Sequence, residues 1–254
     1  MDRALVLGNS LSFEQTAIQE ITPNVKPIVD EKVSTKSLRC AEHENIAIVY
    51  ESKNIFYKAA KRFFDIVLSL SAIILLLPLF AFTALLIYME DRGPIFYTQN
   101  RAGKDMKEFK MYKFRSMYVN ADARFKDLLS QNEQTGHAFK IKNDPRITKI
   151  GKFIRKYSID ELPQLLNILK GDMSIVGPRP ILPFQMKESD SYDRQRLTVK
   201  PGLTCYWQIS GRANIGWDKW VELDLDYIED MSFFTDVKMI LKTIPVVLTG
   251  DGAY

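Results

Sequence analysis

The chain has 254 residues, with 35 lysines and arginines against 31 aspartates and glutamates. This length suits one large domain, or one domain with appendages, and the net charge of +4 permits an anionic partner without requiring one. The two cysteines, Cys40 and Cys205, lack CxxC spacing, which argues against a disulfide framework or a zinc ribbon and fits a reducing compartment. With only two histidines, any divalent ion would be held by carboxylates and phosphates, as Mg²⁺ is.

The N-terminal part of the chain, up to about residue 55, is polar and mixed. Its short apolar runs are interrupted by Pro23 and Pro27. No function can be inferred from this segment.

The strongest compositional feature is an uncharged apolar segment of 24 residues, 66–89. As a straight helix it would extend about 36 Å at about 1.5 Å per residue. That exceeds the roughly 30 Å hydrocarbon core of a bilayer. Pro78 lies near the centre of the segment, where a proline ring removes a backbone donor and kinks or breaks a helix.

Basic residues flank this segment on both sides and bear on how it would meet a membrane. They are Lys58, Lys61 and Arg62 before it, and Arg92, Arg101 and Lys104 after it. A helix broken at Pro78 that enters and leaves the same leaflet keeps both flanks on the anionic cytoplasmic side, whereas a full span carries one flank across. The residues alone favour re-entry but leave a kinked span open, and a buried core helix of a soluble protein is a third alternative.

The pattern after the apolar segment changes to short strands. Residues 95–99 and 109–114, joined by a turn that contains Gly103, predict a β-hairpin. Beyond Ser116 the pattern becomes helical. Residues 232–248 pair aromatic with aliphatic side chains around few charges, so this segment is either a helix in a membrane interface or an ordinary amphipathic core helix.

Two adjacent carboxylates, Asp160 and Glu161, stand just before a proline and an apolar helical run. Ser158 to Glu161 matches the S-x-x-E capping box, in which both side chains bind free amides at a helix N-terminus. Pro163 weakens that interpretation, because it would occupy a position that needs a backbone donor. A helix that starts nearer Asp160 puts Pro163 in the first turn, where a missing N–H is harmless. The free amides of that turn would attract a phosphate as well as a carboxylate. The residues alone leave capping and catalysis both open.

Candidate phosphate-binding residues surround this carboxylate pair in the sequence. Arg155 lies just upstream, and Arg179 lies downstream between Pro178 and Pro180. Arginine binds phosphate through two parallel hydrogen bonds, and flanking prolines would hold Arg179 in one orientation, although a turn with a surface arginine gives the same pattern. The later stretch TCYWQISGR combines aromatic side chains with Arg212, as expected of a base or ribose platform with a second phosphate contact.

Several long motifs, taken in order from about Tyr57 to the C-terminus, closely resemble the bacterial sugar transferase family, the monotopic phosphoglycosyl transferases that act on polyprenyl phosphate. The motifs are KRFFDIVLSL, GPIFYTQNRAG, YKFRSM, DPRITKIGKFIRKYSIDELPQL, NILKGDMSIVGPRP and KPGLTCYWQISGR. The stretch LLSQNEQTGHAFKIKN is longer than in minimal members of the family. It resembles the exopolysaccharide initiators that transfer hexose 1-phosphates.

The resemblance implies a mechanism. In this family the aspartate of the Asp-Glu dyad, here Asp160, attacks the β-phosphate of a UDP-sugar, which gives a covalent sugar-phosphate enzyme and releases UMP. Polyprenyl phosphate then attacks that intermediate. Mg²⁺ is the implied cofactor, held by Asp160 and Glu161 with the diphosphate, and the role of Glu161 is left open between metal binding and proton handling. Motif position assigns phosphate or nucleotide binding to Lys113, Arg155, Pro178, Arg179, Pro180 and Arg212, and a supporting role to Asp236.

The resemblance also implies an α+β, mostly helical fold: a re-entrant membrane helix hairpin broken at Pro78, a small β-hairpin, and amphipathic interfacial helices around a cytoplasmic catalytic domain. Residues 1–56 would form an N-terminal extension, 57–92 the membrane hairpin and 93–254 the catalytic domain. The protein would lie on the cytoplasmic face of the bacterial cell membrane.

The expected partners are a UDP-sugar donor, a polyprenyl phosphate acceptor and the lipid bilayer. No nucleic acid is expected, and the oligomeric state is left open, a homo-oligomer included. Two alternatives in function remain. The first is a membrane-anchored scaffold or binding protein without turnover, and the presence of the dyad and the arginines argues against it. The second is a glycosyl transferase that transfers only the sugar, which would release UDP rather than UMP.

Overall fold

The computed structural model describes residues 46–121, 123, 141, 144–211 and 215–250. Within these residues there are two small sheets, an antiparallel pair of β1 (Phe96–Ala102) and β2 (Glu108–Phe114), and a parallel pair of β3 (Ser174–Val176) and β4 (Gly202–Thr204). The helical elements are α3 (Ile46–Ser52), α4 (Ile55–Glu90), η2 (Lys104–Met106), α6 (Lys149–Lys156), η4 (Ile159–Gln164), α7 (Leu165–Lys170), α8 (Pro183–Glu188), α9 (Ser191–Arg194), η5 (Gln195–Thr198), α10 (Tyr206–Ile209), α11 (Trp217–Asp230) and α12 (Phe233–Thr249). The predicted mostly helical α+β architecture is confirmed.

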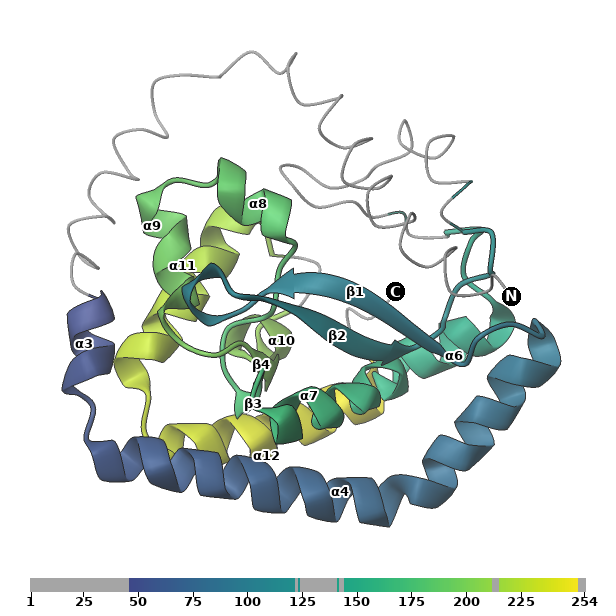
Figure 1. The fold of residues 1–254 in the computed structure, drawn as a ribbon, viewed down its shortest axis with the longest axis horizontal. Helices are drawn as coiled ribbons and strands as arrows, with labels where there is room; N and C mark the ends of the chain where they lie inside the picture. Colours follow the sequence, from purple (N-terminus) through teal and green to yellow (C-terminus); the bar gives the residue numbers. More distant parts are fainter. Residues whose placement is uncertain (1–45, 122, 124–140, 142–143, 212–214, 251–254) are drawn as a thin grey trace, which may run out of the picture.

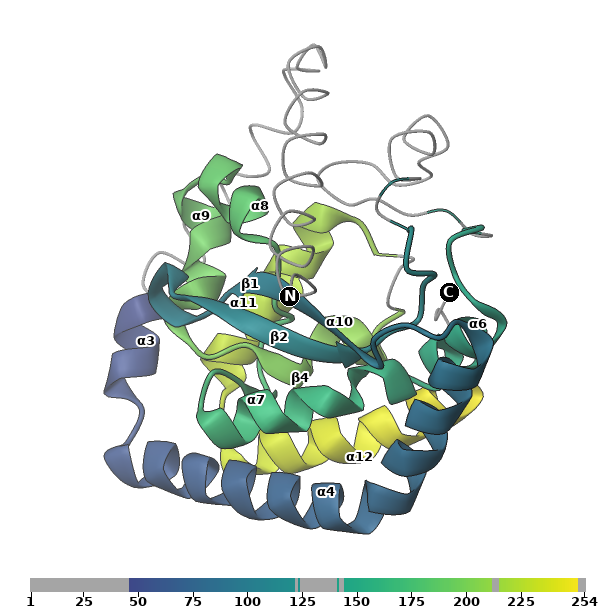
Figure 2. The same ribbon diagram turned by 45° about the vertical axis from the view of Figure 1, so that its right-hand side comes forward.

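Helix α4 contains the apolar segment and is a single helix of 36 residues with Pro78 inside it. Within the described residues it is the one helix that is long and apolar enough to cross a membrane. It runs along one side of the protein and then bends toward α6 (Figures 1 and 2). The sequence predicted a break at Pro78; the structure has a continuous, bent helix.

The outer face of α4 is strongly apolar. Side chains such as Phe63, Leu75 and Met89 are 62%, 80% and 67% exposed. Contiguous apolar exposure on this scale is typical of a surface that binds a partner or a membrane. The helix is therefore compatible with a membrane anchor.

The first half of α4 docks onto the rest of the protein through charged side chains. Arg62 donates from its two terminal nitrogens to the carbonyl oxygens of Ile168 and Leu169, at 2.6 and 2.8 Å. These carbonyls belong to the last turn of α7, where a cation is favoured because backbone acceptors are left unpaired. Asp65 accepts from the hydroxyl of Ser174 at 3.0 Å and thereby joins α4 to β3.

The other end of α4 docks onto α6. Both carboxylate oxygens of Glu90 accept from backbone amides, those of Lys149 and Ile150, at 2.7 and 3.0 Å. These are free donors at the start of α6, so Glu90 caps that helix from outside it. Thr148 completes the cap by accepting from the amide of Gly151 at 2.8 Å. Both ends of α4 therefore contact the same body.

The predicted β-hairpin is confirmed. Strand β1 extends three residues further than the predicted 95–99, and β2 begins one residue earlier than 109. Gly103 lies in the connection between them, as predicted. The register pairs Phe96 with Phe114 and Tyr97 with Lys113, which fixes where Lys113 stands on β2.

Strands β3 and β4 were not predicted. Ser174 pairs with Gly202 and Val176 with Thr204. A Cβ atom on Gly202 would lie 2.1 Å from the backbone nitrogen of Gly177, so a glycine is required for this close approach. The pairing anchors the start of the GPRP loop, residues 177–180.

The largest apolar core lies between α11, α12, β3 and α3. Ile46, which belongs to the predicted extension, is 1% exposed and packs in this core with Val221 and Leu225. The end of the segment 1–56 is thus built into the folded body.

Helix α12 packs one face in the core while its exposed face is also apolar, so for residues 232–248 core packing is confirmed and a place in a membrane interface stays a prediction. Met239 is buried, whereas Phe234 and Leu248 are 84% and 69% exposed. The helix lies beside α4 (Figures 1 and 2), and the rings of Phe64 and Phe233 are 5.2 Å apart. The exposed apolar faces of α4 and α12 are neighbours.

Candidate active site

The Asp160–Glu161 dyad lies in the 3-10 helix η4, which begins directly after Ser158. Ser158 has a left-handed backbone conformation, with φ of 54°, and its side chain makes no capping hydrogen bond. The side chain of Glu161 reaches away from the backbone toward two cations. The capping-box alternative is therefore wrong, and both carboxylates are free to take part in a different network.

Glu161 is the centre of that network. Its Oε1 atom accepts from Nζ of Lys113 at 2.9 Å and from Nη2 of Arg179 at 2.6 Å. Nη1 of Arg179 lies 3.4 Å from the other carboxylate oxygen. The side chain of Glu161 is only 9% exposed, so these contacts replace most of its hydration. Two predicted phosphate-binding residues, from β2 and the GPRP loop, thus meet one member of the dyad.

The side chain of Arg179 has further neighbours in α10. Its guanidinium lies 5.0 Å from the ring centroid of Trp207, and Nη1 is 3.5 Å from the amide oxygen of Gln208. The ring of Trp207 is also stacked on that of Trp220, with 5.0 Å between centroids. Trp207, from the stretch predicted to form a base or ribose platform, thus packs against the guanidinium of Arg179.

Asp160 differs from Glu161 in its surroundings. It is 7% exposed, and no hydrogen bond to its carboxylate is found among the described residues. Burial, reinforced by the charge of Glu161, raises the pKa of Asp160 above its usual value, against the opposing effect of Lys113 and the arginines at 155 and 179. The result is a carboxylate that lies close to cations without being held by them.

The charges around the dyad stabilise one another. Burial alone would raise the pKa of Glu161, but Arg179 and Lys113 outweigh it and hold that pKa well below its usual range. Burial lowers the pKa of Lys113, although both carboxylates oppose this. Burial would likewise lower the pKa of Arg179, but Glu161 raises it further than burial lowers it. Glu161 is thus anionic and Arg179 cationic throughout the physiological pH range.

The GPRP loop is held by its carbonyl oxygens, because prolines at 178 and 180 have no N–H to donate. Three carbonyls of the loop, and that of Ile181 directly after it, each accept a hydrogen bond from a different residue. The pairs are Gly202 N to Pro178 O (2.8 Å), Arg196 Nη2 to Arg179 O (3.3 Å), Arg101 Nη1 to Pro180 O (3.3 Å) and Ala102 N to Ile181 O (2.9 Å). The structure agrees with the predicted rigid presentation of Arg179.

Arg155 lies in the last turn of α6, close to the dyad. Its charge lowers the pKa of Asp160 and also that of Asp144 in the DPRIT motif. Asp144 is itself buried in a two-point contact with Arg146, whose Nη2 lies 2.7 Å from Oδ2. Arg155 therefore links the DPRIT motif electrostatically to the dyad.

Two other predicted residues lie elsewhere. Arg212 falls outside the described residues. Asp236 accepts from Lys61 Nζ at 2.8 Å and Tyr57 OH at 3.1 Å, in a network that joins α4, α11 and α12. Its second oxygen lies 2.8 Å from the hydroxyl of Tyr227, which is also 3.1 Å from the carbonyl of Val176 in β3. Within the described part of the chain, Asp236 is thus connected to the GPRP loop by way of Tyr227 and Val176 of β3.

The predicted Mg²⁺ site can be compared with the donors that are present. Within the described residues there is no group of three or more acidic, cysteine or histidine side chains arranged to hold a metal. Protein-bound Mg²⁺ commonly uses one or two carboxylates together with substrate phosphates and waters, which the dyad matches. Glu161 is engaged with Lys113 and Arg179, so the unengaged oxygens of Asp160 are the more available ligands.

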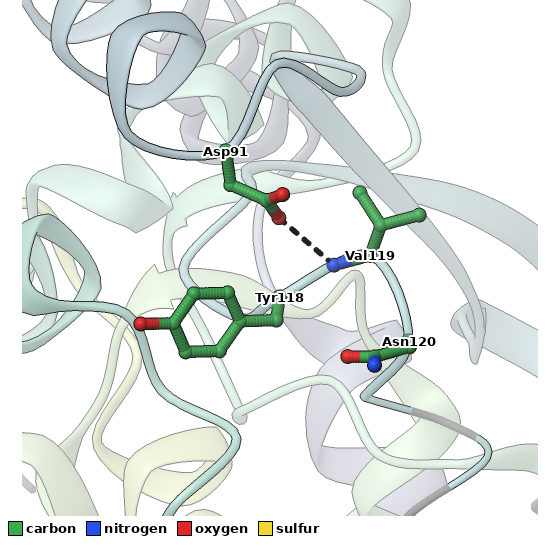
Figure 3. A pocket seen from close by; sticks show the side chains of 4 residues that line it. All are labelled: Asp91, Tyr118, Val119 and Asn120. Carbon is green, nitrogen blue, oxygen red and sulfur yellow. Dashed lines mark hydrogen bonds between the residues drawn. The ribbon is translucent and has the colours of Figure 1, made fainter.

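A separate hollow of about 500 Å³ lies at the end of α4, lined by Asp91, Tyr118, Val119 and Asn120 (Figure 3). The carboxylate of Asp91 points toward the backbone of Val119 and accepts from its nitrogen at 3.0 Å. Neither member of the dyad lines this hollow, so its shape does not define the candidate active site.

Comparison with known proteins identifies the family. The model for the bacterial sugar transferases matches residues 56–250. The chain belongs to this family. It is 46% identical over 92% of its length to the galactosyl transferase CpsE of Streptococcus agalactiae, and 44% identical over 76% to the undecaprenyl-phosphate galactose phosphotransferase of Salmonella typhimurium. The matches cover 52% and 41% of those two proteins, so the chain spans about half their length.

A shorter relative is matched almost completely. The exopolysaccharide production protein ExoY of Sinorhizobium fredii is 40% identical over 77% of this chain and 88% of its own length. The family match begins at residue 56, so α3 precedes it.

Several residues beside the dyad were not among the predicted site residues. Gln208 and Trp207 lie within the quoted motif TCYWQISGR, and Arg101 lies within GPIFYTQNRAG, so the motifs held a signal for them. Arg196 lies outside every quoted motif. A buried arginine cannot be told from a surface arginine by local pattern.

Proposed function

We propose that this protein transfers a hexose 1-phosphate from a UDP-sugar to polyprenyl phosphate, a reaction that initiates exopolysaccharide or capsule assembly. Family membership supports the reaction class, and the names of the Salmonella and Streptococcus relatives support the lipid acceptor and the hexose. The observation that carries the proposal is the contrast within the dyad. Glu161 is held by two cations, whereas Asp160 is buried beside them with its oxygens unengaged by the described residues.

In the first step, a carboxylate oxygen of Asp160 attacks the β-phosphorus of the UDP-sugar. The bond between that phosphorus and the bridging oxygen breaks, and UMP leaves with the bridging oxygen. The product is an acyl phosphate that carries the sugar, which is the kind of intermediate an aspartate nucleophile forms in other phosphoryl-transfer enzymes. Lys113, Arg155 and Arg179 supply positive charge close to Asp160, where charge accumulates on phosphate oxygens.

In the second step, a phosphate oxygen of the polyprenyl phosphate attacks the same phosphorus. The bond to Asp160 breaks, the carboxylate is restored, and the product is a polyprenyl diphosphate sugar. Glu161 keeps Lys113 and Arg179 in place through both steps, since its pKa stays low and its charge is constant. Mg²⁺, when bound by Asp160 and Glu161 with the diphosphate, would neutralise charge on the phosphates and orient them.

The contacts of α4 support a re-entrant arrangement on the cytoplasmic face. Arg62 and Asp65 near its start, and Glu90 at its end, contact the same folded body. A helix that spanned the bilayer would separate these two ends by the hydrocarbon core, and one set of contacts would be lost. The bend of α4 and the apolar face of the neighbouring α12 fit a protein that sits in one leaflet.

The experiment that tests the mechanism uses purified full-length protein in detergent with UDP-hexose labelled in its β-phosphate and Mg²⁺, without acceptor. We expect about one labelled protein and one UMP per active site. Asp160→Asn is expected to abolish both, because an amide cannot form the acyl phosphate. Asp105→Asn, an exposed aspartate on η2, is the matched control and is expected to label as the wild type does.

Each rival predicts a different result in the same assay. A non-catalytic scaffold would release no nucleotide, and a transferase that passes only the sugar would release UDP once acceptor is added. A folded Asp160→Asn protein with near-normal turnover would contradict the role of Asp160. Glu161→Gln is expected to reduce turnover by weakening the hold on Lys113 and Arg179.

A further inference from the structure

A buried ion pair contacts the GPRP loop at the backbone of Arg179. Arg196 of η5 and Asp224 of α11 are each 1% exposed and form a direct ion pair. Such a pair is costly to bury and is weak evidence for stability by itself. Its position therefore calls for another explanation.

The guanidinium of Arg196 contacts the GPRP loop as well as Asp224. Its Nη2 atom donates to the carbonyl oxygen of Arg179 at 3.3 Å. Two indole rings pack against its guanidinium, with 5.0 Å from the guanidinium carbon to the ring centroid of Trp220 and 5.6 Å to that of Trp217. Asp193 fixes Trp217 in turn, by accepting from its indole nitrogen at 2.9 Å. Arg196 is thereby held through Nη2 and the indole rings, whereas its Nε and Nη1 atoms are buried without a hydrogen-bond partner among the described residues.

The same tryptophan layer reaches the side chain of Arg179. Trp220 stacks on Trp207, and Trp207 lies against the guanidinium of Arg179. Arg179 is thus contacted twice by one assembly, at its carbonyl by Arg196 and at its guanidinium through the stacked rings. Among the described residues, that guanidinium also donates to Glu161 and Gln208.

We propose that Arg196 and Asp224 form a positioning pair for Arg179, which they orient through its carbonyl oxygen without touching the substrate. Asp224 fixes Arg196, Arg196 fixes the loop backbone, and the prolines on either side transmit that orientation to the Arg179 side chain, since their φ angles are constrained. The role of Arg179 in binding phosphate rests on the proposed function. The positioning itself is a property of the loop and can be measured without substrate.

The test replaces both members at once, because removing one alone leaves a buried unpaired charge and destabilises the fold. In Arg196→Met/Asp224→Leu the pair becomes apolar while the volume is largely kept. We expect the protein to stay folded and the catalytic efficiency with UDP-sugar to fall about tenfold, the order expected for one hydrogen bond from a charged donor. The matched control, Lys219→Ala/Glu222→Ala, removes an exposed ion pair from the same helix α11 and is expected to change nothing.

Two further measurements separate positioning from general stability. In an Arg179→Ala background the double substitution is expected to cost no further activity, since the group that it positions is already gone. The amide of Gly202 donates to Pro178 in the loop, and that of Ala102 to Ile181 directly after it; hydrogen exchange at both is expected to speed up in the Arg196→Met/Asp224→Leu variant and not in the control. Additive losses in activity, or unchanged exchange in the folded variant, would overturn the proposal. Faster exchange in a protein that transfers no sugar phosphate would instead uphold positioning and reject the proposed function.

Discussion

Lys61 of α4 and Asp236 of α12 form an ion pair, with 2.8 Å between Nζ and Oδ2. Each side chain is 13% exposed, and Asp236 also accepts from the hydroxyl of Tyr57 at 3.1 Å. An apolar helix is thus fastened to the folded body by a charged network that is largely out of contact with water.

This network predicts an asymmetric effect of substitution. Asp236→Ala leaves the largely buried charge of Lys61 without its partner and should lower the free energy of unfolding by about 3 kcal/mol. Lys61→Met/Asp236→Leu removes both charges and should lower that free energy clearly less. Thermal unfolding in detergent measures both, with Lys219→Ala as a control for an exposed pair. Equal losses in the single and double variants would contradict the explanation.

The raised pKa of Asp160 predicts an acid limit for the first chemical step. A protonated carboxyl group cannot attack phosphorus, so the rate of protein labelling should fall as the pH falls through a pKa above about 3.9, the value for an unperturbed aspartate. Burial and the charge of Glu161 both raise this pKa. In Glu161→Gln the limit should therefore move to lower pH, as measured by single-turnover labelling. A shift to higher pH would mean that Glu161 lowers the pKa of Asp160.

The close approach of β3 and β4 predicts that Gly202→Ala is strongly destabilising. The added methyl group would lie 2.1 Å from the nitrogen of Gly177, so the two strands must separate and release the GPRP loop. Gly216→Ala is the matched control, because nothing lies within 4 Å of the added atom there. We expect a large drop in unfolding temperature and activity for the first variant and almost none for the second. If Gly202→Ala and Gly216→Ala had similar unfolding temperatures and activities, the close contact between β3 and β4 would not require a glycine.

The two docked ends of α4 predict the accessibility of its flanks. Cysteines introduced one at a time, Ala59→Cys or Arg92→Cys, in a Cys40→Ser background that keeps the buried Cys205, should react with a membrane-impermeant maleimide only after cells are permeabilised. Adding Pro78→Leu restores a backbone donor and favours a straight helix, so a fraction of the Arg92→Cys protein should become reactive in intact cells. Reaction of Arg92→Cys from outside without the Pro78 change would exclude re-entry.

The sequence reveals those parts of the site that depend on neighbouring residues. The adjacency of Asp160 and Glu161, the prolines around Arg179 and the two hairpin strands are all local patterns, and each was found. The capping-box match failed because Glu161 is bound by Lys113, which is 48 residues away along the chain. A buried contact with two cations outweighs a hydrogen bond to a nearby amide.

Other parts depend on long-range packing and leave no local pattern. Strands β3 and β4 have three residues each, too few to show an alternating pattern. Arg196 meets Asp224 from 28 residues away, and its burial depends on tryptophans that fold over it. Such residues are found only when the chain is seen folded.

A helix that is fastened to one body at both ends experiences a membrane differently from a spanning helix. If α4 dips into the cytoplasmic leaflet and returns, the thickness of the opposite leaflet does not enter its energetics, and the penalty for hydrophobic mismatch that sorts spanning helices among membranes does not apply. In that arrangement its bent shape would displace lipid from one leaflet only. The lateral packing of that leaflet, rather than bilayer thickness, would then be the membrane property that affects this protein most.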